Sequence, residues 1–254
     1  MDHQSNLVLG NAVLWALNPM QTFPGGMCIR DGRIRRIFNR DAMPNEPVTD
    51  LKGMHVIPGL IDAHRHFFVS ALLPLYGDAG VWRSKDDALS AIDAACRAGG
   101  ADNPWVMFSG LNNAVWKDPA LPGLSEIDAV AGSTPVLVID STCHRGLISS
   151  AALVRAGINR RALTFPSDID LTFDGRLKGV IWEDALGRMI FAMYRQIIER
   201  YSIEDRRRLI LDEADRCLKK GLTHVHDPGV PSDVQRLLKG AQPYTPLKLS
   251  WSVT

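Results

Sequence analysis

The chain has 254 residues, of which 46% are hydrophobic and 22% are charged, and its formal net charge is +1. These values are typical of a globular protein and give no indication of a surface for nucleic acid or for an anionic membrane. The four cysteines have no CxxC spacing, no apolar run reaches about 18 residues and no signal peptide is recognisable, so we expect a reduced, cytoplasmic protein without a membrane span.

The first 57 residues alternate short β-like runs with turns. Asp31-Gly32 lies between the apolar runs Met27–Arg30 and Arg33–Phe38, and an Asp-Gly in this position is typical of a β-hairpin. Lys52-Gly53 is expected to form another turn. The remaining strand-like runs are 7–9, 12–17, 48–51 and 54–57. Residues 1–57 are therefore predicted to form a small β-sheet domain.

The next segment, Met54–Phe67, reads MHVIPGLIDAHRHF and ends with two histidines one residue apart. Residues 58–66 are predicted to form a buried strand that enters a different domain. On an extended strand, His64 and His66 share one face and Arg65 points to the other. Two such imidazoles can bind one metal ion. The alternative is that both histidines merely end the strand.

Residues 67–205 are predicted to form a long insertion. Within it, Ser84 is expected to cap a helix from Lys85 to about Arg97, with Asp87 completing a capping box. Further expected elements are buried strands at 105–108 and 135–139, a short helix from Ser149-Ser150 to Gly157, and an amphipathic helix over 184–201 with a core-packing stripe of Met189, Met193, Ile197 and Tyr201.

The chain then returns to alternating helices and strands. Ser202 is expected to open a helix that Gly221 ends, and Leu222–His226 is expected to form a strand. A helix over Pro231–Gly240 and a strand over Leu247–Val253 follow.

VIPGLIDAHRH (Val56–His66) resembles the PG-[FL]-[IV]-D-x-H-x-H signature of the amidohydrolase superfamily. The preceding segments are similar to the amidohydrolase-3, or YtcJ-like, branch, which includes N-substituted formamide deformylases. GLTHVHDPG resembles the G-[IV]-T-x-V-x-D segment of that branch. The resemblance runs from about Leu7 to the end of the chain and implies an α/β fold. Its parts would be a β-sandwich portion (1–57), about three strands of a metal-dependent-hydrolase (β/α)8 barrel (58–66 and 206–254) and an inserted α+β region (67–205).

The resemblance also implies a site. His64 and His66 would bind a divalent metal, most simply zinc. Glu183 lies in GVIWEDA, which resembles the family motif G-x-L-x-E-x-A, and would be a third metal ligand or a catalytic carboxylate; the alternative is a glutamate favoured at a helix start by the dipole. His144 lies in DSTCHRGLISSAAL, where Thr142-Cys143-His144 take the places of the family's D-G-H. This histidine would contact substrate or polarise its carbonyl, unless its role is structural.

Other candidates are weaker. His224 and His226 form a second His-x-His on one strand face, for which packing inside the barrel is the favoured interpretation. Asp227 is expected to cap a turn with Pro228-Gly229. Cys143 is not expected to be a nucleophile, because nothing in the sequence places a base beside it.

The predicted function is hydrolysis of a non-peptide C–N bond of a small molecule, in an amide, formamide or cyclic amide, by a metal-activated water. The resembled enzymes take two further histidines and an aspartate from later strands, and no residue here matches them. The alternative is therefore a catalytically incomplete N-terminal fragment or non-enzymatic remnant. Its open strand edges would favour aggregation, a homo-oligomer or a second chain that completes the barrel. A third alternative, a binding module formed by 67–205, has no motif in its support.

Overall fold

The computed structural model describes residues 7–17, 19–42, 44–99, 105–158 and 168–253. The chain divides by its contacts into two compact units: Met1–Asp62 with Leu218–His224, and Ala63–Cys217 with Val225–Thr254. The predicted three-part division stays a prediction. In the described part of the chain, no helix combines the length and the apolar character that crossing a membrane requires.

The strands are β1 (Leu7–Leu17), β2 (Met20–Arg30), β3 (Arg33–Asn39), β4 (Thr49–Asp50), β5 (His55–Val56), β6 (Leu60–Asp62), β7 (Gly77–Asp78), β8 (Val106–Leu111), β9 (Val136–Asp140), β10 (Arg145–Ile148), β11 (Ile169–Leu171), β12 (Leu177–Trp182), β13 (Leu222–Val230) and β14 (Lys248–Val253). The α-helices are α1 (Phe67–Leu72), α2 (Lys85–Ala98), α3 (Leu124–Ala131), α4 (Ser150–Ala156), α5 (Glu183–Ile198), α6 (Ile203–Lys219) and α7 (Ser232–Ala241).

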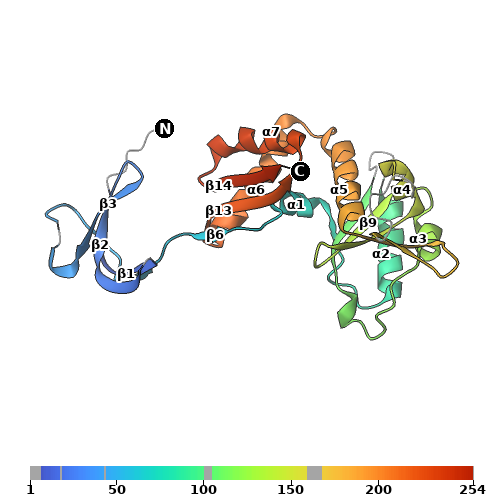
Figure 1. Cartoon of the computed structure of the whole chain (residues 1–254), viewed down its shortest axis with the longest axis horizontal. Coiled ribbons are helices and arrows are strands. Elements are labelled where there is room, and N and C mark those ends of the chain that lie inside the picture. Colours follow the sequence, from blue (N-terminus) through green and yellow to red (C-terminus); the bar gives the residue numbers. More distant parts are fainter. Residues whose placement is uncertain (1–6, 18, 43, 100–104, 159–167, 254) are drawn as a thin grey trace. The chain divides into compact units, whose positions relative to one another are not determined.

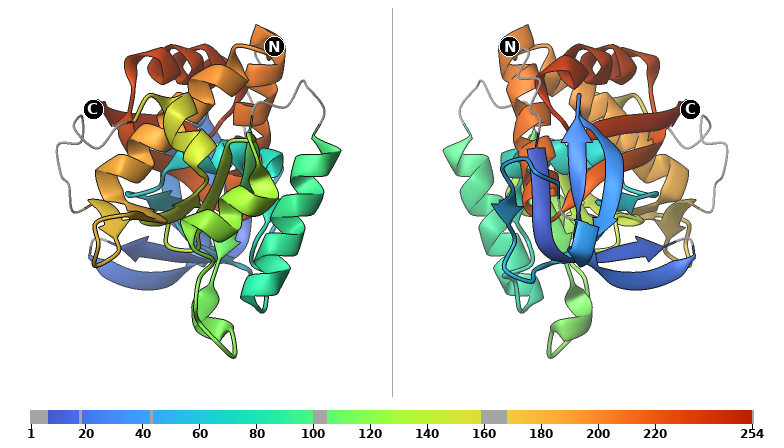
Figure 2. Two further views of the ribbon diagram at one scale, coloured as in Figure 1. Left: turned by 90° about the vertical axis from the view of Figure 1, so that its right-hand side faces the viewer. Right: turned by 90° about the vertical axis from the view of Figure 1, so that its left-hand side faces the viewer.

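The first unit contains a sheet with the order β3-β2-β1-β4, in which β5 also pairs with β1 (Figure 2, right, blue). The predicted hairpin is confirmed: Arg30 pairs with Arg33, and Asp31 (φ 53°) and Gly32 (φ 67°) form the left-handed turn between β2 and β3. The two runs predicted before it are one strand, β1, whose register shifts between Leu9 and Ala12. A β-bulge thus replaces the expected break.

The second unit contains a six-stranded sheet with the order β11-β12-β10-β9-β8-β7 (Figure 1). The side chains of Val136 and Val138 in β9 pack in one apolar cluster with residues of α2 and α3, which lie side by side (Figure 2, left). Leu137 and Ile139 pack in another with residues of α4 and α5. Because both faces are covered, every residue of β9 is buried. The two buried strands predicted within the insertion are confirmed as β8 and β9.

The helix starts predicted at Ser84 and Ser202 are confirmed, and each is decided by a local contact. The Ser84 hydroxyl accepts the Asp87 N–H at 3.1 Å, and the Ser202 hydroxyl accepts the Asp205 N–H at 3.1 Å. In α5, Met189 and Met193 are fully buried, as the apolar stripe predicts. The Ile197 side chain of the same stripe lies outside the described part of the structure.

The prediction of a buried strand over 58–66 is wrong. Within this range, only β6 is a strand. Leu60 and Ile61 are 50% and 65% exposed, and neither side chain packs in the apolar clusters seen among the described residues. Leu60 donates its N–H to the Gly221 carbonyl at 3.0 Å, and Arg65 donates its N–H to the His226 carbonyl at 2.9 Å. From the first hydrogen bond to the second, the β6 segment and β13 advance in the same direction by the same number of residues, which is the register of a parallel pair. β13 is longer than predicted and includes Asp227. The α-helices and β-strands given above confirm the predicted mixed α/β class.

Candidate active site

A cavity of about 410 Å³ in the second unit brings the predicted site residues together. His64 and His66 reach it from the segment between β6 and α1, and His144 reaches it from the loop between β9 and β10. Glu183 lines it from the first position of α5. Residues far apart in the sequence therefore share one cavity. Its remaining lining residues are Val69, Cys143, Leu186, Gly187, Ile190, Phe191, Pro228 and Gly229.

The two histidine rings lie close together. Their centroids are 5.5 Å apart, and their planes meet edge to face at 86°. His66 is the residue before α1, with φ −70° and ψ 70°, so the pair lies on an irregular segment and not on the extended strand that we predicted. The rings nevertheless face a common cavity, which is the property that a shared metal ligand pair needs.

Arg65, between the two histidines, is anchored in the opposite direction. Its Nη2 lies 2.5 Å from Oε1 of Glu213 on α6, and the Glu213 side chain is only 3% exposed. Glu213 also accepts from Nε of Arg216 at 2.7 Å. This carboxylate was not predicted from the sequence, although its place among the buried residues Ile210 and Ala214 of α6 was a signal. The buried ion pair holds the histidine segment against α6.

Asp227 anchors the other end of this segment. Its Oδ2 accepts the Phe68 N–H at 3.0 Å, and its Oδ1 accepts the Gly229 N–H at 3.3 Å and lies 3.9 Å from Nδ1 of His66. Burial raises the pKa of the Asp227 carboxyl, and the backbone N–H donors of Phe68 and Gly229 oppose that shift. Asp227 does contact Gly229 as predicted, but both residues lie within β13 and not in a turn. The contacts with the start of α1 and with His66 were not predicted, and they place a carboxylate beside a metal-ligand candidate.

His144 and Glu183 form a pair. Nδ1 of His144 lies 3.1 Å from Oε2 of Glu183, and the Glu183 N–H donates to the His144 carbonyl at 3.1 Å. Glu183 has φ 37°, a left-handed conformation that is unfavourable for a residue with a side chain. In the neutral tautomer that carries its proton on Nδ1, His144 donates to the Glu183 carboxylate and Nε2 keeps its lone pair for another group.

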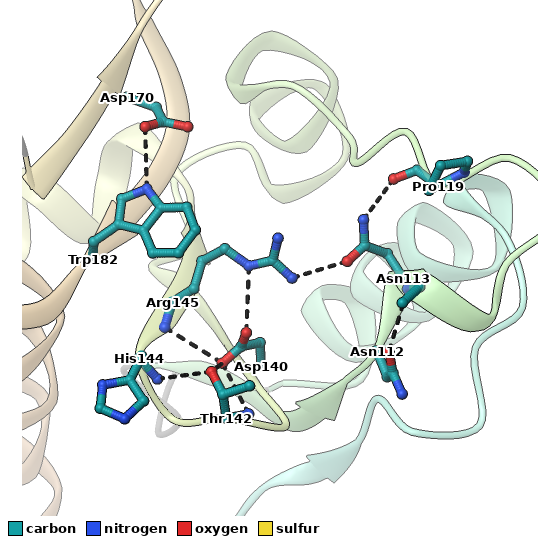
Figure 3. A network of polar contacts seen from close by, with 10 residues as sticks. Asn112, Asn113, Pro119, Asp140, Thr142, His144, Arg145, Asp170 and Trp182 are labelled. Carbon is teal, nitrogen blue, oxygen red and sulfur yellow. Dashed lines mark hydrogen bonds and ion pairs between the residues drawn. The ribbon is translucent and has the colours of Figure 1, made fainter.

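A polar network holds the loop that carries His144 (Figure 3). Asp140 is 6% exposed, and its Oδ1 accepts the N–H and the hydroxyl of Thr142 at 3.2 and 2.8 Å. Nε of Arg145 lies 3.4 Å from Oδ2 of Asp140, and its guanidinium lies 5.6 Å from the Trp182 ring centroid. Thr142 and Arg145, which lie on either side of His144 in the chain, therefore both contact Asp140 at the end of β9.

Cys143 completes this loop in a left-handed conformation, with φ 62°. Cys143 is exposed as a whole, but partial desolvation of its thiol, followed by the nearby charge of Asp140, raises the pKa of that thiol. A raised pKa disfavours the thiolate, which agrees with the expectation that Cys143 is not a nucleophile. Glycine, which the resembled D-G-H motif has at this place, adopts this backbone conformation without strain.

We therefore predict that Cys143→Gly raises the free energy of unfolding by about 1 kcal/mol, because it removes the left-handed strain of a residue with a Cβ. Urea denaturation measures this change. Cys96→Gly, within α2, is the control and should lower stability by at least about 1 kcal/mol, since glycine disfavours a helix interior. A loss of stability in both variants would show that Cys143 is not strained.

The donor types suit a divalent metal, although a complete ligand set is not assembled. Within residues 7–17, 19–42, 44–99, 105–158 and 168–253, no group of three or more His, Cys, Asp or Glu side chains is close enough to hold a metal ion. The cavity does collect two converging imidazoles and a carboxylate, the nitrogen and oxygen donors that zinc takes. His226 instead places Nδ1 and Nε2 3.0 and 3.1 Å from the hydroxyls of Ser250 and Ser252, which favours its structural interpretation.

The chain is similar in sequence and in fold to known proteins. The chain is 26% identical over 261 residues to N-substituted formamide deformylase of Arthrobacter pascens, covering 96% of this chain and 47% of that protein. It is 28% identical over 203 residues to the putative amidohydrolase YtcJ of Bacillus subtilis, covering 77% of this chain and 36% of that protein. An uncharacterized metal-dependent hydrolase from Pyrococcus horikoshii has a similar fold, with a TM-score of 0.64 at 18% identity over 98% of this chain and 48% of its own.

The chain thus spans about half the length, or less, of these relatives. The sequence profile described as "Amidohydrolase family" matches residues 47–248, which is most of the chain and includes every candidate site residue. The resemblance seen in the motifs is thereby confirmed, and the chain belongs to the amidohydrolase family.

Proposed function

We propose that this protein is a metal-dependent amidohydrolase that cleaves a non-peptide C–N bond of a small molecule, in an amide, a formamide or a cyclic amide. The observation that carries this proposal is the convergence of the His64 and His66 rings on a cavity that also contains the His144–Glu183 pair. Family membership supports the reaction class.

In this proposal His64 and His66 would be ligands of a divalent metal, zinc, and Glu183, which lines the same cavity but does not form a ligand cluster with them in this structure, would be the third. Zinc bound there would supply a water of lowered pKa and would polarise the substrate carbonyl. Oε2 of Glu183 lies beside His144, and its second oxygen is the candidate metal donor.

The chain's own residues then position the substrate. Glu183 orients the His144 ring through Nδ1, and Nε2, when it carries a proton, would donate to the substrate carbonyl oxygen. Asp227 and the Arg65–Glu213 ion pair hold the histidine segment from its two sides. The cavity's polar end would therefore receive the scissile amide.

The proposal extends to the fold. We assign β1–β5 to a β-sandwich portion and β6, β13 and β14 to an incomplete (β/α)8 barrel with about three strands. Active sites of such barrels lie at the C-terminal ends of the strands, where His64 and His66 follow β6. We further propose a cytoplasmic protein that forms a homo-oligomer or associates with a second chain.

Elemental analysis of the purified chain, prepared without a polyhistidine tag or chelator, tests this function. About one or two zinc ions per chain, together with hydrolysis of a formamide or another amide, is the expected result. A metal ratio near zero in folded protein would contradict the proposal for this chain and would favour the catalytically incomplete alternative.

A further inference from the structure

One face of α5 forms a wall of the cavity. From Glu183, the residues at positions i+3, i+4, i+7 and i+8 of the helix line the cavity, as expected for one helical stripe. They are Leu186, Gly187, Ile190 and Phe191. With a rise of 1.5 Å per residue, the stripe extends about 12 Å along the helix axis. Along α5 the lining therefore changes from polar at Glu183 to an apolar end at Ile190 and Phe191, and Val69 of α1 also lines the cavity.

Gly187 lies within this apolar stripe, in the interior of a helix that runs from Glu183 to Ile198. A glycine in a helix interior costs about 0.5–1 kcal/mol relative to alanine. A Cβ added at Gly187 would meet no atom within 4 Å, and its φ is not positive. By contrast, Gly179 has φ 89°, and a Cβ there would lie 3.0 Å from the Leu124 backbone. Neither backbone conformation nor packing requires the glycine at 187.

Because Gly187 faces the cavity, its missing side chain has one evident effect, which is to enlarge the apolar end of the site. The flanking side chains show what would fill that space. Leu186 and Ile190 are 1% and 7% exposed and belong to the apolar core, so they offer little surface to a ligand. Phe191, four residues after Gly187 on the same stripe, and Val69 are the lining residues whose apolar side chains are partly exposed. A ligand group that lies beside them would bury apolar surface.

We propose that Gly187 is a specificity-determining residue that admits a bulky apolar substituent of the amide substrate, branched or aromatic, over its backbone and beside Phe191. This inference rests on the proposed function for the orientation of the substrate. The amide lies toward His144 and Glu183, and its apolar substituent extends along α5 over Gly187. The chemical class of ligand is thus an amide with a large apolar group, and not a small polar one.

Calorimetric binding of N-methylformamide and N-benzylformamide to the wild-type chain and to Gly187→Ala and Gly187→Leu tests this inference. We expect wild type to prefer the benzyl compound, and Gly187→Leu to lower that affinity at least about 10-fold with little change for the methyl compound. Gly187→Ala should have the same effect in smaller measure while raising the melting temperature, since alanine favours the helix. A general loss of structure would lower both the melting temperature and the affinity, so it could not explain a higher melting temperature together with a lower affinity for the benzyl compound.

Gly240 in α7 supplies the matched control, because it is also helical, a Cβ there meets no atom within 4 Å, and it does not line the cavity. Gly240→Leu should leave the benzyl-to-methyl affinity ratio unchanged. An unchanged ratio in Gly187→Leu, an equal change in both leucine variants, or a wild type that binds neither compound would overturn the inference. Binding with the expected ratio but without hydrolysis would instead contradict the proposed function and leave the role of Gly187 supported.

Discussion

Glu213→Gln is expected to lower the free energy of unfolding by about 3 kcal/mol, because it leaves the Arg65 guanidinium without its buried countercharge. Glu213 is 2% exposed and accepts from both Arg65 and Arg216, so water cannot readily replace the lost interactions. Urea denaturation followed by circular dichroism measures the change. Since Arg65 lies between His64 and His66, the same substitution should also weaken metal binding.

Two further variants separate the lost charge from lost packing. The double variant Arg65→Met, Glu213→Leu should recover most of the stability, since an apolar pair of similar size requires no desolvated charge. Asp93→Asn, which breaks the exposed pair with Arg97 on α2, should change stability by less than about 0.5 kcal/mol. A similarly small effect of Glu213→Gln would mean that the buried pair does not hold the histidine segment.

Replacing either His64 or His66 by alanine is expected to lower zinc affinity more than about 100-fold, since loss of a group that merely supports a ligand already costs 10–100-fold. Amide hydrolysis should fall in parallel, because the metal supplies the attacking water in the proposed function. Zinc retained after dialysis against a buffered free-zinc concentration measures the affinity, and circular dichroism checks that each variant is folded.

His226→Ala is the control for this experiment, because it removes a histidine from the second His-x-His pair. Its ring nitrogens already contact the hydroxyls of Ser250 and Ser252, so we expect zinc retention to match wild type. An equal loss of zinc in His226→Ala and His64→Ala would reject the assignment of the metal to the first pair alone.

The elements that the sequence predicted correctly depend on contacts between near neighbours. The Asp31-Gly32 hairpin needs two left-handed residues between strands, and the helix starts at Ser84 and Ser202 need a hydroxyl three residues before an N–H. Both requirements can be recognised in a few adjacent letters. The strand over 58–66 was predicted as buried from its apolar letters alone, but burial depends on what packs against the side chains.

The candidate site shows the same division. The PG-LID-x-H-x-H signature and the motifs around His144 and Glu183 were sufficient to identify these residues as candidates. They were not sufficient to show that His144 contacts Glu183, 39 residues away, or that Cys143 adopts a left-handed conformation. Residues that are far apart in the sequence can make such a contact at many different spacings, so no sequence motif of fixed spacing can predict it.

By itself, the sequence determined the family, the pair of metal-binding candidates and most local helix and hairpin signals. Only the tertiary structure showed that Asp227 accepts the Phe68 N–H from 159 residues away, and only it identified Glu213, which pairs with Arg65 from 148 residues away. It also placed Gly187 on the cavity wall, where no neighbouring atom accounts for the missing side chain. The physical reason is that hydrogen bonds, ion pairs and cavities depend on positions in space, which local sequence patterns constrain only within a few residues.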